Sequence, residues 1–285
     1  PITTVLFQAN QYFEEVLQRV PEFSAACSMH SYLYMHQVLD DMDKHIGELP
    51  DPAITEIFEL GKADYEKAIR FARTPDQRAS LELDLAYLNG NWRGMTDRME
   101  KLLEHRGCFS GLWYEAVSLP FGYAERLNPL LEELVVCDPL TVSNWAKLAR
   151  ARVWGNDPDG VLEVTRRGLA IVDSDTLVAQ QAVGLILKGQ NEQAQIELDT
   201  RIKSADNSKT YLVLIAAALG QREKAEALLK EYRESPDESK FNTLAMYAWT
   251  GDRENANRWA ASLDQHPFGY IALSIAVLHC NCGEP

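Results

Sequence analysis

Apolar residues along this chain recur at helical spacing, in runs that end at regularly placed glycines. The spacing i, i+4, i+7 keeps such residues on one face of a helix, as in Ala225, Leu229 and Tyr232. The glycines lie 31 to 34 residues apart and are Gly90, Gly122, Gly155, Gly189, Gly220, Gly251 and Gly283. That period is typical of stacked helix-turn-helix units, so the sequence predicts an all-α fold, an α-solenoid of about eight degenerate repeats.

Each internal glycine is predicted to end a helix in the left-handed conformation, which costs a residue with a Cβ roughly 1–2 kcal/mol. Five residues later comes the residue that opens the next helix: Met95, Leu127, Gly160, Ala194, Ala225 or Ala256. Two helix starts carry capping boxes, Thr74-Pro75-Asp76-Gln77 and Ser235-Pro236-Asp237-Glu238. These signals predict both ends of several helices.

The two ends of the chain each interrupt a repeat. Residues 3–19 have the pattern of a second helix that lacks its first helix, and residues 271–280 have that of a first helix that lacks its second. We therefore expect a single solenoid over residues 1–285, excised from a longer chain. Longer helices are expected over residues 1–74 and more regular repeats over residues 75–285.

The composition narrows the range of partners. The chain has 285 residues, of which 46% are hydrophobic, and a formal net charge of −14. No stretch reaches the roughly 18 consecutive apolar residues of a membrane span. Nucleic-acid binding is not expected, because phosphate affinity depends on clustered Lys and Arg. A basic or apolar protein or peptide is the expected partner.

The glycine, the alanine five residues later and the apolar residue four after that resemble the tetratricopeptide repeat, as in residues 220–229 and 251–260. This resemblance implies a right-handed superhelix. Three further segments, residues 9–23, 88–92 and 138–144, resemble the repeat region of bacterial CadC-like transcriptional activators and adenylate-cyclase-linked regulators. In such proteins an effector domain and a TolB-like domain precede the repeats. The resemblance leaves a cytoplasmic and a periplasmic location equally open.

In tetratricopeptide arrays the first helices line the concave face, and the resemblance places this face at fixed positions before each turn glycine. The candidate groove residues are Leu112, Trp145, Arg152, Val183, Leu214 and Phe241. A mostly apolar groove suits an apolar peptide or an amphipathic helix. The same residues also suit a tightly packed superhelix with no groove. The Lys and Asn set that clamps a terminal carboxylate in some family members does not recur here.

No catalytic motif is present, so we expect neither an enzyme nor a bound cofactor or metal. His36 and Asp40 lie at i, i+4 and suit either an acid–base pair or an ordinary helix-surface contact, of which we favour the second. Cys27, Cys108 and Cys137 are expected to be buried, reduced thiols. Residues 279–282 offer two thiols and an imidazole, but their spacing argues against zinc.

Three classes of function follow from these observations. An interaction scaffold or sensory module of a bacterial regulator is favoured. A self-association module, with a homodimer as its product, is the first alternative. An enzyme built as an α/α toroid is the second, although the 31 to 34 residue period is short for such a ring.

Overall fold

The computed structural model describes residues 2–44, 52–104, 118–202, 209–234, 243, 246–247 and 250–263. Within these ranges the chain is all-α, with thirteen helices and no strand. It divides into two compact units, the first built mainly from residues 1–104 and the second mainly from residues 115–256. The predictions for Leu112, Phe241, Gly283 and residues 271–282 lie outside the described residues.

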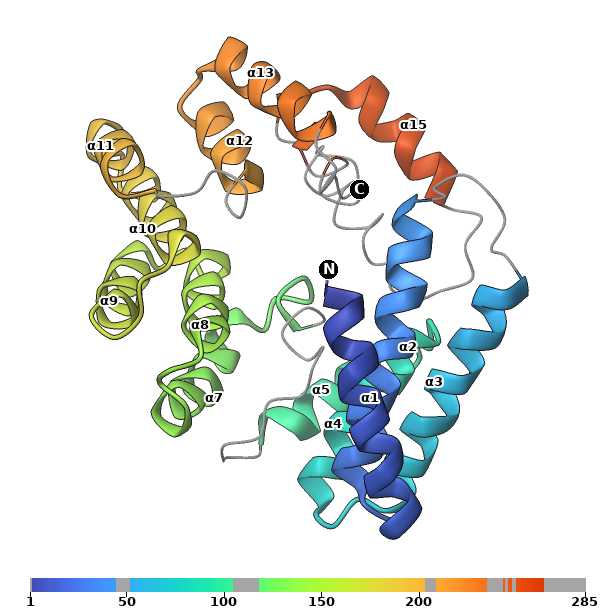
Figure 1. Ribbon diagram of the computed structural model, residues 1–285. Coiled ribbons are helices and arrows are strands. Elements are labelled where there is room, and N and C mark those ends of the chain that lie inside the picture. Colours follow the sequence, from blue (N-terminus) through green and yellow to red (C-terminus); the bar gives the residue numbers. More distant parts are fainter. Residues whose placement is uncertain are drawn as a thin grey trace. The chain divides into compact units, whose positions relative to one another are not determined.

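In the first unit each helix packs against the next along the chain (Figure 1). Its helices are α1 (Ile2–Arg19), α2 (Ser24–Lys44), α3 (Pro52–Arg70), α4 (Pro75–Leu88) and α5 (Met95–Leu103). The predicted cap of α4 is confirmed, because Thr74 Oγ1 accepts from the Gln77 amide at 3.1 Å. In return, Gln77 Oε1 accepts from the Arg73 amide at 3.0 Å. The longest helices of the described ranges, α2 and α3, lie in this part of the chain.

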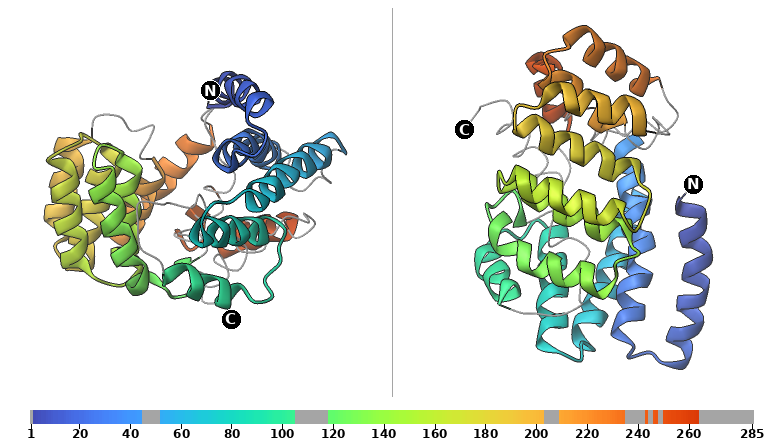
Figure 2. Two further views of the ribbon diagram at one scale, coloured as in Figure 1. Left: turned by 90° about the horizontal axis from the view of Figure 1, so that it is seen from below. Right: turned by 90° about the vertical axis from the view of Figure 1, so that its left-hand side faces the viewer.

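In the second unit the helices pack in sequential pairs, and the right-hand view of Figure 2 shows them stacked side by side. They are α7 (Ala124–Cys137), α8 (Val142–Trp154), α9 (Pro158–Leu169), α10 (Asp175–Leu187), α11 (Asn191–Arg201), α12 (Lys209–Ala218) and α13 (Arg222–Arg233). Helix α15 (Arg253–Leu263) is divided between the units, with the residues up to Ala256 in the second unit and those from Asn257 in the first. In the pairs α8 with α9, α10 with α11 and α12 with α13, the first helix α10 also contacts the first helices α8 and α12. These three first helices therefore form one layer. This arrangement is consistent with a helical repeat array.

Small residues allow the paired helices to approach closely. Ala194, Ala225 and Ala256 are each at most 1% exposed, which confirms the predicted stripe. A Cβ added to Gly168 would lie 2.9 Å from Leu177 Cδ1, and one added to Gly184 would lie 2.8 Å from Val161 Cγ1. Such distances are shorter than van der Waals contact, so the spacing of α8, α9 and α10 depends on these glycines.

The predicted left-handed conformation is confirmed at five turn glycines and is wrong at the sixth. Gly90, Gly122, Gly189, Gly220 and Gly251 have φ between 62° and 83°. Gly155 has φ −79°, and the next residue, Asn156, takes the left-handed conformation with φ 51°. The turn there closes one residue later, with the Asp157 amide donating to the Arg152 carbonyl at 2.9 Å. Asparagine is one of the few residues with a Cβ that tolerates this region.

We expect the two kinds of turn glycine to respond differently to a methyl group. Gly220→Ala should lower the free energy of unfolding by about 1–2 kcal/mol, because the left-handed backbone strains a residue with a Cβ. Gly155→Ala should change it by less than about 0.5 kcal/mol, since its backbone is ordinary and its new Cβ meets only van der Waals contacts. Urea unfolding followed by circular dichroism measures both, and equal losses would contradict the assignment.

Candidate functional site

A polar hollow of 480 Å³ lies where the first half of α7 meets the end of α8. It is lined by Glu125, Asn128, Pro129, Glu132, Arg152, Gly155 and Asp157. We call it the α7–α8 hollow. It contains Arg152, one of the groove residues expected from the sequence, and it lies entirely within the second unit.

Helix α7 presents polar groups to the hollow because its apolar face is turned the other way. Leu127 and Leu131 are completely buried, whereas Glu125, Asn128 and Glu132 follow one another at spacings of three and four and share a face. Pro129 lies inside the helix and has no N–H. The carbonyl of Glu125, four residues earlier, therefore lacks its usual helical donor.

Asn128 is the least satisfied polar side chain of the hollow. It is 9% exposed, and its Oδ1 atom is buried without a hydrogen-bond partner. Leaving a buried amide unpaired costs about 1–3 kcal/mol, so native structures seldom keep one without a reason. This side chain has no partner within the described part of the protein.

Arg152 is held by carboxylates on both sides. Its Nη1 lies 3.0 Å from Asp157 Oδ2, and its Nη2 lies 3.4 Å from Glu132 Oε1. Asp157 also caps α9, because its Oδ1 accepts from the Gly160 amide at 2.9 Å. Both terminal nitrogens of Arg152 are therefore already used within the protein and join α7, α8 and the start of α9. Its buried Nε has no hydrogen-bond partner among the described residues.

Trp145 forms part of the wall behind this cluster. Its ring is 3% exposed, and its Nε1 donates to the Pro139 carbonyl at 2.8 Å. The Arg167 guanidinium lies 5.2 Å from the ring centre and also bonds Glu132 Oε2 at 3.1 Å. Of the two possibilities that the sequence left open, the enclosed ring agrees with tight packing between helices and not with an accessible groove residue, because α9 packs over it through Gly168.

The charge of the hollow is negative. Three carboxylates and one guanidinium line it, and Arg167 adds a second cation from the side of α9. Glu132 and Asp157 are engaged by these arginines, whereas Glu125 makes no ion pair with any described residue. The hollow therefore suits a neutral or cationic group better than an anion.

The remaining groove candidates lie on other helices of the same unit. Val183 on α10 and Leu214 on α12 are half-buried, and Val183 packs against the core formed by α10, α11 and α12. Their helices are in contact. Leu112 and Phe241 cannot be placed, because they lie outside the described residues.

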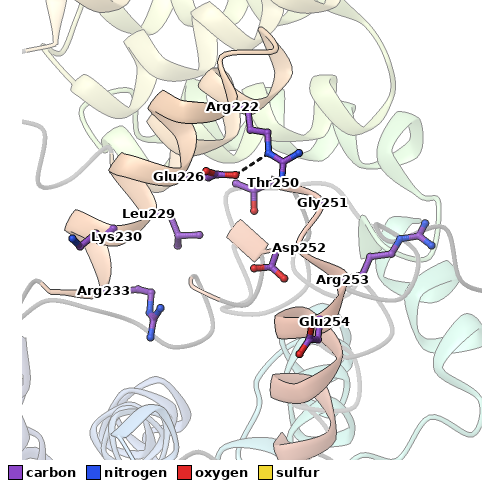
Figure 3. Close-up of a pocket in the computed structure, with 10 residues that line it drawn as sticks. All are labelled: Arg222, Glu226, Leu229, Lys230, Arg233, Thr250, Gly251, Asp252, Arg253 and Glu254. Atoms are coloured by element: carbon purple, nitrogen blue, oxygen red, sulfur yellow. Dashed lines mark hydrogen bonds and ion pairs between the residues drawn. The ribbon is translucent and has the colours of Figure 1, made fainter.

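Two other hollows offer less to a ligand. Figure 3 shows one of 570 Å³ between α13 and the start of α15, where Arg222 Nε donates to Glu226 Oε1, one helical turn along α13, at 2.8 Å. A smaller one of 200 Å³ lies among α11, α12 and α13 and is mostly apolar. The second is lined by Gln221, whose Oε1 is also buried without a partner, but its Nε2 donates to Gln195 Oε1 at 3.3 Å.

A buried His–Asp pair in the first unit was not expected from the sequence. His30 Nδ1 on α2 lies 2.7 Å from Asp64 Oδ2 on α3, and Lys67 Nζ lies 2.9 Å from Asp64 Oδ1. Glu14 on α1 lies 3.7 Å from His30 Nε2. The predicted His36–Asp40 contact is untested, because the Asp40 side chain lies outside the described residues.

The pair shifts the pKa of both partners. The hydrogen bond with Asp64 raises the pKa of His30 most strongly, although burial lowers it. Burial raises the pKa of Asp64, but the hydrogen bonds from His30 and Lys67 outweigh it, so the pKa is lowered overall. Both shifts favour a charged pair that joins α2 to α3.

The cysteines and possible metal ligands define no further site within the described ranges. Cys27 is a buried free thiol, as expected. Cys137 is disulfide-bonded, which corrects the prediction of a reduced thiol there, and Cys108 is not described. No group of three or more His, Cys, Asp or Glu side chains in the described part of the chain could hold a metal ion.

Comparison with known proteins does not assign the chain to a family. No family model matches it, and no curated protein matches it either. Among the described helices, none is both long enough and apolar enough to cross a membrane.

We expect the His30–Asp64 pair to make stability depend on pH. Because the folded pKa of His30 is raised, its contribution is complete below the ordinary value of 6.5 and is lost as the pH rises through the folded pKa. The contribution of Asp64 is lost only as the pH falls through its lowered pKa. Asp64→Asn should therefore cost about 1–3 kcal/mol near pH 6 and less at alkaline pH.

Urea unfolding of the unchanged chain and of the Asp64→Asn variant, each near pH 6 and at alkaline pH, measures this difference. Glu59→Gln is the matched control on α3, because Glu59 forms only an exposed pair with Lys62 at 3.0 Å. It should cost less than about 1 kcal/mol at either pH. A loss for Asp64→Asn that does not change with pH would rule out the titrating pair.

Proposed function

We propose that this chain is a non-catalytic, tetratricopeptide-like module that binds a protein or peptide. The observation that carries the proposal is a partly exposed apolar face on consecutive first helices. Val183 and Ile186 on α10 and Leu214 and Ala217 on α12 are all half-buried, and the two helices are in contact. Apolar side chains spread over neighbouring helices suit an amphipathic helix or an extended apolar peptide.

The repeated turns support the same class of protein. Left-handed glycines followed five residues later by buried small residues are found at Gly189 and Gly220, and this is the pattern on which the resemblance to tetratricopeptide repeats was based. The net charge of −14 supports a protein partner over nucleic acid. In the proposed setting the module belongs to a bacterial multidomain regulator and receives a signal or partner for it.

Self-association is the second candidate, and an exposed apolar flank of α1 favours it. Tyr12 and Val16 on α1 and Val20 directly after it are 69%, 36% and 49% exposed, respectively. A second copy of the chain could cover this flank. Sedimentation equilibrium of the whole chain, compared with a Val16→Lys variant, distinguishes a dimer formed through α1 from a monomer.

We expect peptides selected from a random display library to bind the α10–α12 face. Leu214→Ala and Leu214→Asp should each weaken a selected peptide about tenfold or more, because a central apolar contact is lost. Ile196→Asp is the control, because Ile196 is 55% exposed and lies on α11, the second helix of its pair, which is not part of the proposed face. Fluorescence anisotropy measures the affinities, and circular dichroism verifies the fold.

Two results would contradict the proposal. Failure to select any peptide would remove the binding function itself. Equal loss of affinity in the Leu214 and Ile196 variants would place the binding surface elsewhere on the protein.

A further inference from the structure

We propose that the α7–α8 hollow is a separate binding site for a lysine-containing peptide segment, with Asn128 as its backbone contact and Glu125 as its charge contact. This inference rests on the proposed function and adds the chemistry of the partner. It uses residues of α7, the end of α8 and the turn after it, and none of the residues of the apolar face on α10 and α12.

The unpaired amide of Asn128 points to a peptide group. Its Oδ1 is buried without a partner, and no hydrogen bond of the described protein uses its Nδ2. A side-chain amide offers one acceptor and one donor side by side, and a peptide group offers the complementary N–H and C=O. Rotation about the final side-chain bond is soft, so the amide can turn to present both atoms to a ligand. Binding would then satisfy a group that the free protein leaves unpaired.

The acidic groups of the hollow point to a cation on the same ligand. Glu125 makes no ion pair with a described residue, while the other two carboxylates are held by Arg152 and Arg167. The carbonyl of Glu125, which Pro129 deprives of its helical donor, is a further acceptor on the same residue. A lysine ammonium carries three donors and can serve both oxygens. A glutamate in its place would be repelled.

The size of the hollow agrees with a short segment. Its 480 Å³ falls within the roughly 300–1,000 Å³ of sites that enclose small ligands. Glu132 and Asp157 hold the two terminal nitrogens of Arg152, so only its buried Nε is left as a donor for the ligand. Its role is to fix α8 against α7, so that Asn128 and Glu125 keep their places.

The test uses the whole chain and three blocked glycine–serine peptides that differ only at their central residue, which is lysine, norleucine or glutamate. Amide-resolved NMR titration measures even weak binding. The lysine peptide should shift the amides of residues 124–132 and 152–157 and should bind about tenfold more tightly than the norleucine peptide. The glutamate peptide should not bind there.

Asn128→Leu separates a binding role from a structural one. Replacing an unpaired amide by an apolar group of similar shape should leave the melting temperature unchanged or raise it. The same change should weaken the lysine peptide about tenfold. Asn257→Leu is the matched control, because Asn257 follows Gly251 by six residues just as Asn128 follows Gly122, and it is exposed. Glu125→Gln should abolish the preference for lysine over norleucine. Glu192→Gln should not, because Glu192 follows Gly189 by three residues, as Glu125 follows Gly122, but lies outside the hollow.

The outcomes also distinguish this inference from the proposed function. If library-selected peptides bind the α10–α12 face but the lysine peptide gives no shifts around α7, the hollow is not a site and the broader function stands. Equal affinities for the three peptides, or equal effects of Asn128→Leu and Asn257→Leu, would overturn the inference as well. If no peptide binds anywhere, both proposals fail.

Discussion

Close packing of each helix against its partner is the constraint on which the second unit depends. The position five residues after the turn is buried and small at Ala194 and Ala225, and is buried but large at Leu127. At the two alanines a larger side chain is expected to overpack the contact. The left-handed residue at the turn complements it, because it reverses the chain within two or three residues and returns the second helix onto the first. The layer formed by α8, α10 and α12 is a consequence of repeating this contact.

Polar side chains between neighbouring helices also fix the position of each helix along its neighbour. Glu132 forms ion pairs with both Arg152 and Arg167, so one carboxylate joins α7, α8 and α9. In the first unit Asp64 joins α3 to α2 in the same manner through His30. An unpaired charge in such a place is costly, so helices that slide relative to one another lose these contacts together. Asn128 differs from these paired groups, because its Oδ1 is one of several buried side-chain atoms that have no hydrogen-bond partner among the described residues.

The two surfaces proposed for binding differ in chemistry. The face of α10 and α12 is apolar and partly exposed, whereas the α7–α8 hollow is acidic and carries an unused amide. A partner with an apolar helix and a basic segment would use both, and an acidic protein attracts such a partner over a longer range than contact. Each surface contributes to specificity in a different way, since apolar contacts supply affinity and the polar hollow selects against the wrong charge.

The sequence by itself determined the features that depend on near neighbours in the chain. Helix limits such as the cap at Thr74, and the left-handed turns at Gly189 and Gly220, follow from local backbone preferences. Only the tertiary structure decided that Asn156 and not Gly155 takes the left-handed conformation, because both residues tolerate the turn and the hydrogen bond closing α8 selects between them. It also decided the enclosure of Trp145 and the pairing of His30 with Asp64, because these depend on helices that meet across intervening chain. Local spacing specifies which residues share a helix face, but what covers that face is set by packing between helices.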